Sequence, residues 1–160
     1  MLFPAVVRAF IFNPEGQILL TQHQENTPWV LPGGHVEKDE SLHDAMLREV
    51  REEFNIAARF FEIDDTEILH HKGKKLNHHP LPVAIYDLEY KNAEGKDKSR
   101  TEYIFLMETD DTINSTQVEE IHDYKWFEVE DILSMKPNIE GYDFMIEMLE
   151  KIVGDEDDEE

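Results

Sequence analysis

The sequence predicts an α/β fold from three observations. A β-prone run from Val6 to Phe12, interrupted by Arg8, is followed by turn residues 13–16 and a second apolar run at residues 18–20, which is the pattern of a β-hairpin. Residues 42–54 carry apolar side chains at helical spacing, and so do residues 142–153. Strands and helices therefore share one chain of 160 residues.

The remaining elements follow from the same patterns. Residues 29–31 form a short strand that leads into Gly33 and Gly34, and residues 57–70 form one or two strands. Residues 83–90 and 102–107 are predicted to pair as a hairpin with a long exposed loop. That loop would contain residues 92–95 and the basic side chains Lys91, Lys96, Lys98 and Arg100. A further strand is expected at residues 124–129.

Composition limits the possible functions. The length indicates a single domain, expected over residues 1–153, and residues 154–160 form an acidic tail expected to be disordered. The chain has no Cys, which excludes disulfides, thiolate metal sites and a cysteine nucleophile. A net charge of −22 argues against nucleic acid or anionic membranes as partners and favours a small ligand brought in by a metal. Without an apolar run of about 18 residues or a signal-like N-terminus, the expected compartment is the cytoplasm.

The helix predicted over residues 42–54 has an unusual distribution of charge. The face expected to turn toward the protein body starts apolar and ends acidic. Within an arc of roughly 120° it carries Leu42, Ala45, Met46, Glu49, Glu52 and Glu53. The glutamates repel one another at spacings of three and four residues, and they lie at the negative end of the helix dipole.

A bound hard cation would reverse both unfavourable terms. Oxygen ligands without Cys or His suit Mg²⁺, Mn²⁺ or Ca²⁺, and Mg²⁺ typically combines carboxylates with substrate phosphates. A phosphate ester or anhydride is therefore the inferred partner. Because the chain has 37 Asp and Glu, composition alone could also produce an acidic face. The glycine pair, the Ser41 start and the Asn55 stop favour a built site instead.

The segment resembles the signature of the Nudix hydrolases. Its fixed positions are Gly34, Glu40, Arg48, Glu49, Val50, Glu52, Glu53 and Ile56, and the one departure is Asn55 where the family has glycine. Asn is the next best residue for the left-handed conformation at a helix end, so the departure should leave the site intact. The resemblance implies a Nudix fold, in which a mixed β-sheet is sandwiched between helices and carries a loop-helix-loop motif.

The resemblance also implies roles for residues. The metal ligands would be Gly34, through its carbonyl, Glu49, Glu52 and Glu53. Arg48 would hold the carboxylates by a salt bridge, and Glu40 would support the loop. Mg²⁺, with Mn²⁺ as a possible substitute, would promote attack of water on a nucleoside diphosphate linked to another moiety. Homodimers are frequent among these relatives, so a homodimer is a possible state.

The general base is a separate question. Glu120 lies six residues before Trp126, as in several Nudix branches, and it is the first candidate. Glu119 is the second, and otherwise Glu52 or Glu53 would serve.

A Nudix-fold nucleotide sensor or interaction module without catalysis is the alternative function, and an interaction domain that recruits basic partners through the acidic tail is another.

Basic and aromatic side chains outside the motif leave further alternatives. The cluster His70, His71, Lys72, Lys74, Lys75, His78 and His79 reads as a solvated loop, as a phosphate-binding loop or as a transition-metal site. Trp29, Phe10 or Tyr103 could stack on a nucleobase, although aromatic residues in strands usually belong to the core. His35 could touch a phosphate or simply occupy a tolerated loop position.

Overall fold

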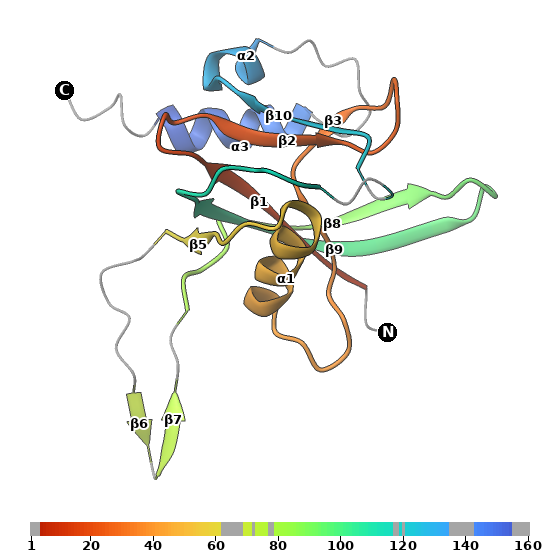
Figure 1. Cartoon of the computed structure of the whole chain (residues 1–160). Coiled ribbons are helices and arrows are strands. Elements are labelled where there is room, and N and C mark those ends of the chain that lie inside the picture. The colour runs from red at the N-terminus through yellow and green to blue at the C-terminus, as the bar shows by residue number, and fades with distance from the viewer. Residues whose placement is uncertain are drawn as a thin grey trace.

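The structure is a computed structural model that describes residues 4–61, 69–71, 73–76, 79–116, 119, 121–134 and 143–154. Figure 1 shows the elements and their labels. In chain order they are β1 (Ala5–Phe12), β2 (Ile18–Gln22), β3 (Trp29–Val30), β4 (Gly33–His35), α1 (Leu42–Phe54), β5 (Arg59–Phe60), β6 (Leu69–His71), β7 (Lys74–Leu76), β8 (Ala84–Lys91), β9 (Asp97–Glu108), β10 (Asp123–Phe127), α2 (Val129–Leu133) and α3 (Asp143–Gly154).

One mixed sheet organises the fold. Its strands run in the order β10-β2-β1-β9-β5, with β3 paired to β2, β4 to β1 and β8 to β9. The central pair β1 and β9 is parallel from Ala5 opposite Thr101 to Phe12 opposite Glu108, whereas the other pairs are antiparallel. The predicted α/β class with a mixed sheet is confirmed.

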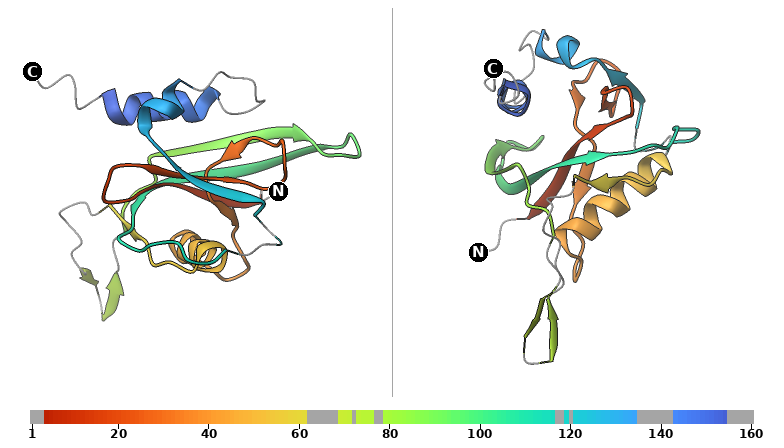
Figure 2. Two further views of the ribbon diagram at one scale, coloured as in Figure 1. Left: turned by 45° about the horizontal axis from the view of Figure 1, so that its top comes forward. Right: turned by 90° about the vertical axis from the view of Figure 1, so that its left-hand side faces the viewer.

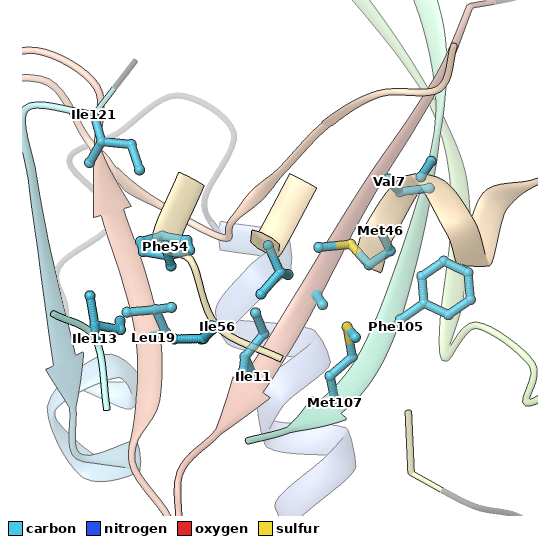
Figure 3. Close-up of a cluster of buried hydrophobic side chains, with 13 residues drawn as sticks. Val7, Ile11, Leu19, Met46, Phe54, Ile56, Phe105, Met107, Ile113 and Ile121 are labelled. Atoms are coloured by element: carbon cyan, nitrogen blue, oxygen red, sulfur yellow. The ribbon is translucent and has the colours of Figure 1, made fainter. Parts of the chain in front are cut away.

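Helices cover both faces of this sheet, as Figure 2 shows. Side chains alternate along β1, so Val7, Ala9 and Ile11 point toward α1 while Phe10 points toward α2 and α3. Figure 3 shows the first of these clusters, in which Met46 and Phe54 of α1 pack on the sheet. The core thus fixes which face of α1 turns inward.

Both ends of α1 are capped by the residues that the sequence indicates. The Ser41 hydroxyl accepts a hydrogen bond from the Asp44 amide at 3.1 Å, which satisfies one of the free donors of the first turn. At the other end Asn55 has a φ of 53° and a ψ of 42°, and its amide donates to the Arg51 carbonyl at 2.9 Å. Asn55 therefore adopts the left-handed conformation that ends the helix, at the position where the family has glycine.

The strand predictions need corrections at three places, one of which is the strand expected at residues 124–129, because β10 ends at Phe127 and α2 begins at Val129. β9 begins at Asp97 rather than near residue 102, so the turn after β8 is short and Lys91, Lys98 and Arg100 lie in strands instead of a long loop. Asn92 makes this possible because its side chain accepts from the Glu94 and Lys96 amides. Leu69–His71 and Lys74–Leu76 pair as a small hairpin where the sequence predicts a solvated loop.

Three elements were not predicted from the sequence. They are β4, which includes the glycine pair, β7 and the short helix α2. Gly154 ends α3, whereas residues 155–160 of the expected acidic tail lie outside the described residues. None of the described helices is long and apolar enough to cross a bilayer.

Candidate active site

The glycine loop, defined here as residues 31–35, lies between β1 and α1. Gly33 pairs with Arg8 and has a φ of 153°, and a Cβ on it would lie 1.9 Å from the Val7 carbonyl oxygen. A Cβ on Gly34 would lie 2.5 Å from Oε1 of Glu49. At Gly33 the near atoms are backbone, so only glycine fits there, whereas at Gly34 the near atoms belong to the end of the Glu49 side chain. The loop backbone therefore lies directly against a glutamate of the predicted metal set.

Arg48 joins the glycine loop to the glutamates. Its guanidinium donates to both carboxylate oxygens of Glu40 at 2.7 and 3.0 Å and to the His35 carbonyl at 3.0 Å. The same side chain donates to Glu49 and Glu52, each at 3.1 Å. The predicted role of Arg48, holding the carboxylates by ion pairs, agrees with this geometry. The bidentate contact explains why arginine rather than lysine suits the position.

Glu40, which precedes α1, and Glu49, Glu52 and Glu53 on α1 are together called the α1 carboxylate cluster, and the first three of them pair with Arg48. Their exposure falls across the cluster from Glu52, whose side chain is 49% exposed, through Glu49 at 12%, to Glu53 at 4%. Glu40 also accepts from the Glu37 amide at 3.0 Å, which ties the loop before α1 to the helix. The cluster therefore runs from solvent into the protein along one face of α1.

The electrostatics of the cluster favour a cation. The guanidinium of Arg48 and the three carboxylates within 3.1 Å of it, those of Glu40, Glu49 and Glu52, carry formal charges that sum to −2. Hydrogen bonding to Arg48 is the main cause that lowers the pKa of Glu40, and the hydrogen bond to Glu40 is the main cause that raises the pKa of Arg48. Glu40 and Arg48 therefore both stay ionised at neutral pH.

The residues present fit a divalent cation. The donors are oxygen atoms alone, which suits a hard cation, and the local excess of negative charge favours one. A Cβ on Gly34 would meet the end of the Glu49 side chain, so the loop lies close to this carboxylate. Among the described residues, no group of three or more His, Asp or Glu is arranged to hold an ion with its side chains as they stand. Glu49 and Glu52 point to Arg48, so coordination by both requires their carboxylates to turn.

Two candidates for the general base, Glu119 and Glu120, precede the strand β10 in the sequence. Glu120 falls outside the described residues, and Glu119 is exposed in a turn. The following residue, Ile121, is 3% exposed and belongs to the buried cluster that contains Phe54, as Figure 3 shows. This contact keeps the start of β10 near the end of α1 that carries the glutamates.

The structure also locates the residues that were candidates for stacking on a nucleobase or for contact with a phosphate. Phe10 is fully buried, so it is a core residue and not a stacking surface. Trp29 packs edge-on against Phe127 at 5.3 Å, and Tyr103 packs against the core on the α1 side. His35 is exposed and contributes its carbonyl to Arg48.

The basic cluster at residues 70–79 contacts α1 at its first turn. Lys72 and His78 lie outside the described residues. His79 stacks on His43 at 4.7 Å, and the His43 ring bonds to the Pro80 carbonyl oxygen at 2.7 Å. His43 precedes Glu53 by ten residues, about 15 Å along a helix, so this contact lies well away from the glutamates in the last turn of α1.

Two residues near the glycine loop were missed by the sequence analysis. Arg8 and Glu102 are separated by 94 positions, yet Nε of Arg8 donates to Oε1 of Glu102 at 2.6 Å. Arg8 also donates to the Leu31 carbonyl at 2.9 Å. The available signal was a charged residue inside the apolar run of β1, but its partner could be found only once the parallel pairing of β1 and β9 was known.

Comparison with known proteins agrees with the motif and the fold. The model of the NUDIX domain matches residues 2–150. The chain belongs to the Nudix family. An RNA pyrophosphohydrolase of Wolbachia pipientis subsp. Culex pipiens (strain wPip) is 26% identical over 134 residues, which are 80% of this chain and 76% of that protein.

Solved Nudix structures share the fold. A NUDIX family hydrolase from Clostridium perfringens superposes with a TM-score of 0.65 at 21% identity, over 95% of this chain and 99% of that one. The C. elegans Ap4A hydrolase superposes with a TM-score of 0.59 at 24% identity, over 96% and 98%. The predicted family and enzyme class, a Nudix pyrophosphohydrolase, are confirmed. Nudix proteins generally use a divalent metal.

Proposed function

We propose that this Nudix protein is a Mg²⁺-dependent hydrolase that cleaves the pyrophosphate linkage of a nucleoside diphosphate joined to another moiety. The observation that carries the proposal is the α1 carboxylate cluster, where Arg48 and the three carboxylates nearest to it sum to −2 directly beside the glycine loop. A diphosphate brings further negative charge, which becomes favourable only when a hard divalent cation is shared between it and the carboxylates.

Each residue of the cluster has a distinct proposed role. Glu49, Glu52, Glu53 and the Gly34 carbonyl hold the metal, with Mn²⁺ as a substitute for Mg²⁺. Glu40 fixes Arg48 by two hydrogen bonds, so that the guanidinium can release Glu49 or Glu52 without leaving its place. Arg48 thereby keeps the remaining carboxylates oriented during turnover.

The proposed reaction is an in-line attack of water on phosphorus. When bound, a divalent metal neutralises charge on the phosphate oxygens and lowers the pKa of a coordinated water. The water oxygen bonds to phosphorus, the bridging P–O bond breaks, and a carboxylate accepts the proton. Glu120 is the first candidate for this base, and Glu119, Glu52 and Glu53 are the others. The buried position of Glu53 would keep bulk water from competing for that proton.

The proposed substrate is a small nucleotide derivative. The relatives named above include an RNA pyrophosphohydrolase and an Ap4A hydrolase, and both names refer to phosphoanhydrides attached to a nucleoside. The net charge of −22 disfavours long nucleic acids through repulsion of their phosphates. We therefore favour nucleoside triphosphates, nucleotide sugars and dinucleoside polyphosphates as substrates, acting in the cytoplasm, with a homodimer as a possible assembly.

A substrate panel tests this proposal. Nucleoside triphosphates, nucleotide sugars, dinucleoside polyphosphates and a 5′-triphosphorylated oligonucleotide are incubated with and without Mg²⁺, and the products are identified. We expect Mg²⁺-dependent release of a nucleoside monophosphate from at least one class. Glu53→Gln should abolish release, and Glu108→Gln is a matched control because Glu108 pairs with Arg59 on the far end of β9. Tight nucleotide binding without turnover would contradict the proposal and favour a sensor.

A further inference from the structure

The glycine loop has a second set of supports on the sheet side, opposite to α1. The Ala9 amide donates to the Pro32 carbonyl at 3.2 Å, and the Val36 amide donates to the Ala5 carbonyl at 2.9 Å. Between these two backbone contacts the Arg8 side chain donates to the Leu31 carbonyl at 2.9 Å. The position of the loop against α1 therefore depends on β1 and on one guanidinium.

Arg8 is held in place by a buried carboxylate. Glu102 on β9 is 2% exposed, and its Oε1 accepts from Nε of Arg8 at 2.6 Å. Nη2 of Arg100 lies 3.6 Å from the same oxygen. Because the guanidinium is planar and its donors have fixed directions, fixing Nε on Glu102 also fixes the direction of Nη1 toward Leu31.

The loop has little freedom on its other side. A Cβ at Gly34 would lie 2.5, 2.6 and 2.8 Å from the three carboxylate atoms of Glu49, so the backbone of Gly34 and this carboxylate are in close contact. A shift of the loop by a fraction of an ångström changes where Glu49 can lie. Misplacement on the order of 1 Å is enough to lower enzyme rates severely.

We propose that Arg8 and Glu102 are positioning residues for the metal site: the ion pair holds the Leu31 carbonyl, and through it the glycine loop, at the distance from α1 that metal binding requires. This rests on the proposed function, which it deepens by adding two residues outside the Nudix motif. In this proposal neither residue contacts the substrate or the metal. Their effect passes through the backbone of residues 31–34.

The test separates positioning from simple stabilisation by a double variant. Arg8→Met with Glu102→Met replaces the ion pair by apolar groups, an exchange that often leaves stability unchanged or raises it. Here, however, Arg100 and the Tyr86 hydroxyl also lose their contacts with Glu102. The contact to Leu31 is lost as well. A matched control is Arg59→Met with Glu108→Met, which removes another ion pair that joins β9 to a neighbouring strand, at 2.8 Å, away from the loop.

Four readouts apply to both double variants and to the wild type. They are the melting temperature, the hydrogen-exchange rates of the Ala9 and Val36 amides, Mg²⁺ affinity by calorimetry without substrate, and kcat and KM. For the Arg8/Glu102 variant we expect a protein that is fully folded at the assay temperature, faster exchange of both amides, and Mg²⁺ affinity and kcat about 10- to 100-fold lower, as for other supports of metal ligands. The control should be folded as well and should match the wild type in the other three readouts.

Wild-type exchange rates and Mg²⁺ affinity in the Arg8/Glu102 variant would overturn the proposal. If that variant does not fold, Arg8→Lys replaces it, because an ammonium keeps the charge beside Glu102 but cannot reproduce the two-pronged contact. Unchanged exchange and affinity in Arg8→Lys would then overturn it equally. Failure of the proposed function would look different, because the wild type itself would bind no Mg²⁺ and release no monophosphate.

Discussion

The Glu102 group on β9 and the α1 carboxylate cluster both place glutamates inside the protein, but they balance charge in opposite ways. Glu102, 2% exposed, has the cations Arg8 and Arg100 within 2.6 and 3.6 Å. At the α1 site, the single guanidinium of Arg48 lies 2.7 to 3.7 Å from the carboxylates of Glu37, Glu40, Glu49 and Glu52. Counted over the same range of distances, the first group carries a local charge of +1 and the second −3.

This difference distinguishes a carboxylate whose charge is balanced within the protein from carboxylates whose charge a bound cation can balance. Burial raises the pKa of Glu102, but the Arg8 charge, the Tyr86 hydroxyl and Arg100 outweigh it, so the pKa of Glu102 lies below its usual value. Burial and the neighbouring Glu102 raise the pKa of Tyr86. That group is complete within the chain. The α1 cluster has an excess of negative charge that a cation from outside can neutralise.

Glu53→Gln should give the largest change and would test the comparison most directly. Removing this carboxylate weakens metal binding, and we expect kcat to fall by about 100-fold or more, because a direct ligand should exceed the 10- to 100-fold loss typical of supporting residues. Stability should change little, because a buried charge is removed together with its repulsion from Glu49. Steady-state kinetics and urea unfolding measure the two effects. A strong loss of stability with normal kcat would show that Glu53 is structural like Glu102.

Glu102→Gln, unlike Glu53→Gln, should lower the unfolding free energy strongly. Removing one partner of a buried ion pair costs about 3–5 kcal/mol, so the unfolding free energy at neutral pH should fall by about that amount. The folded pKa of Glu102 lies below the usual 4.5, so the unfolded state binds more protons in that range. Its stabilisation is therefore present above about pH 4.5 and is lost as the pH falls through the folded value.

Unfolding curves between pH 7 and pH 3 check this expectation. The wild type should lose stability toward the acidic end, and the loss should be smaller in Glu102→Gln because the titrating group is absent. Equal slopes in both proteins would mean that Glu102 does not contribute to acid sensitivity.

The unequal charge balance also predicts the effect of metal on stability. Mg²⁺ at about 100 times its Kd should raise the unfolding free energy by about 2.7 kcal/mol, which corresponds to about 5–10 °C in melting temperature for a domain of this size. The shift should vanish in Glu53→Gln and should only be reduced in Glu102→Gln, because the proposed ligands stay in place while the proposed support of the glycine loop is lost. Calorimetric scans with Mg²⁺ and with EDTA provide the measurement, and an equal shift in both variants would contradict the assignment of the metal to α1.

The α1 carboxylate cluster can be predicted from the sequence, whereas the Glu102 group cannot, and the reason is physical. Helix α1, its Ser41 and Asn55 caps and its acidic face follow from local spacing, and all of them are predicted correctly. The Arg8 and Glu102 pair depends on the parallel register of β1 and β9, which no local pattern encodes. The early start of β9 at Asp97 was missed because Lys and Ser have weak strand propensity, while pairing with β8 overrides it.

Alanine substitutions at Gly33 and Gly34 should separate an effect on stability from an effect on metal binding within the same loop. In Gly33→Ala the Cβ meets the Val7 backbone at 1.9 Å, and the positive φ adds strain, so we expect a loss of about 1–3 kcal/mol in stability. In Gly34→Ala the Cβ meets only the end of the Glu49 side chain. That chain can turn away, so stability should fall by less than about 1 kcal/mol while Mg²⁺ affinity drops. Urea unfolding and calorimetry distinguish the two, and normal Mg²⁺ affinity in Gly34→Ala would argue against a ligand role for Glu49.

Asn55→Gly should give the smallest effect and tests whether the one departure from the family motif matters. Asn55 already adopts the left-handed conformation, with a φ of 53°. Glycine enters that conformation without strain, whereas it increases the entropy of the unfolded chain. The two terms nearly cancel, so we expect stability to change by less than about 1 kcal/mol and kcat to stay at the wild-type value. A change in kcat would mean that the end of α1 orients Glu52 and Glu53. In that case the presence of Asn rather than Gly at position 55 would affect the position of these carboxylates.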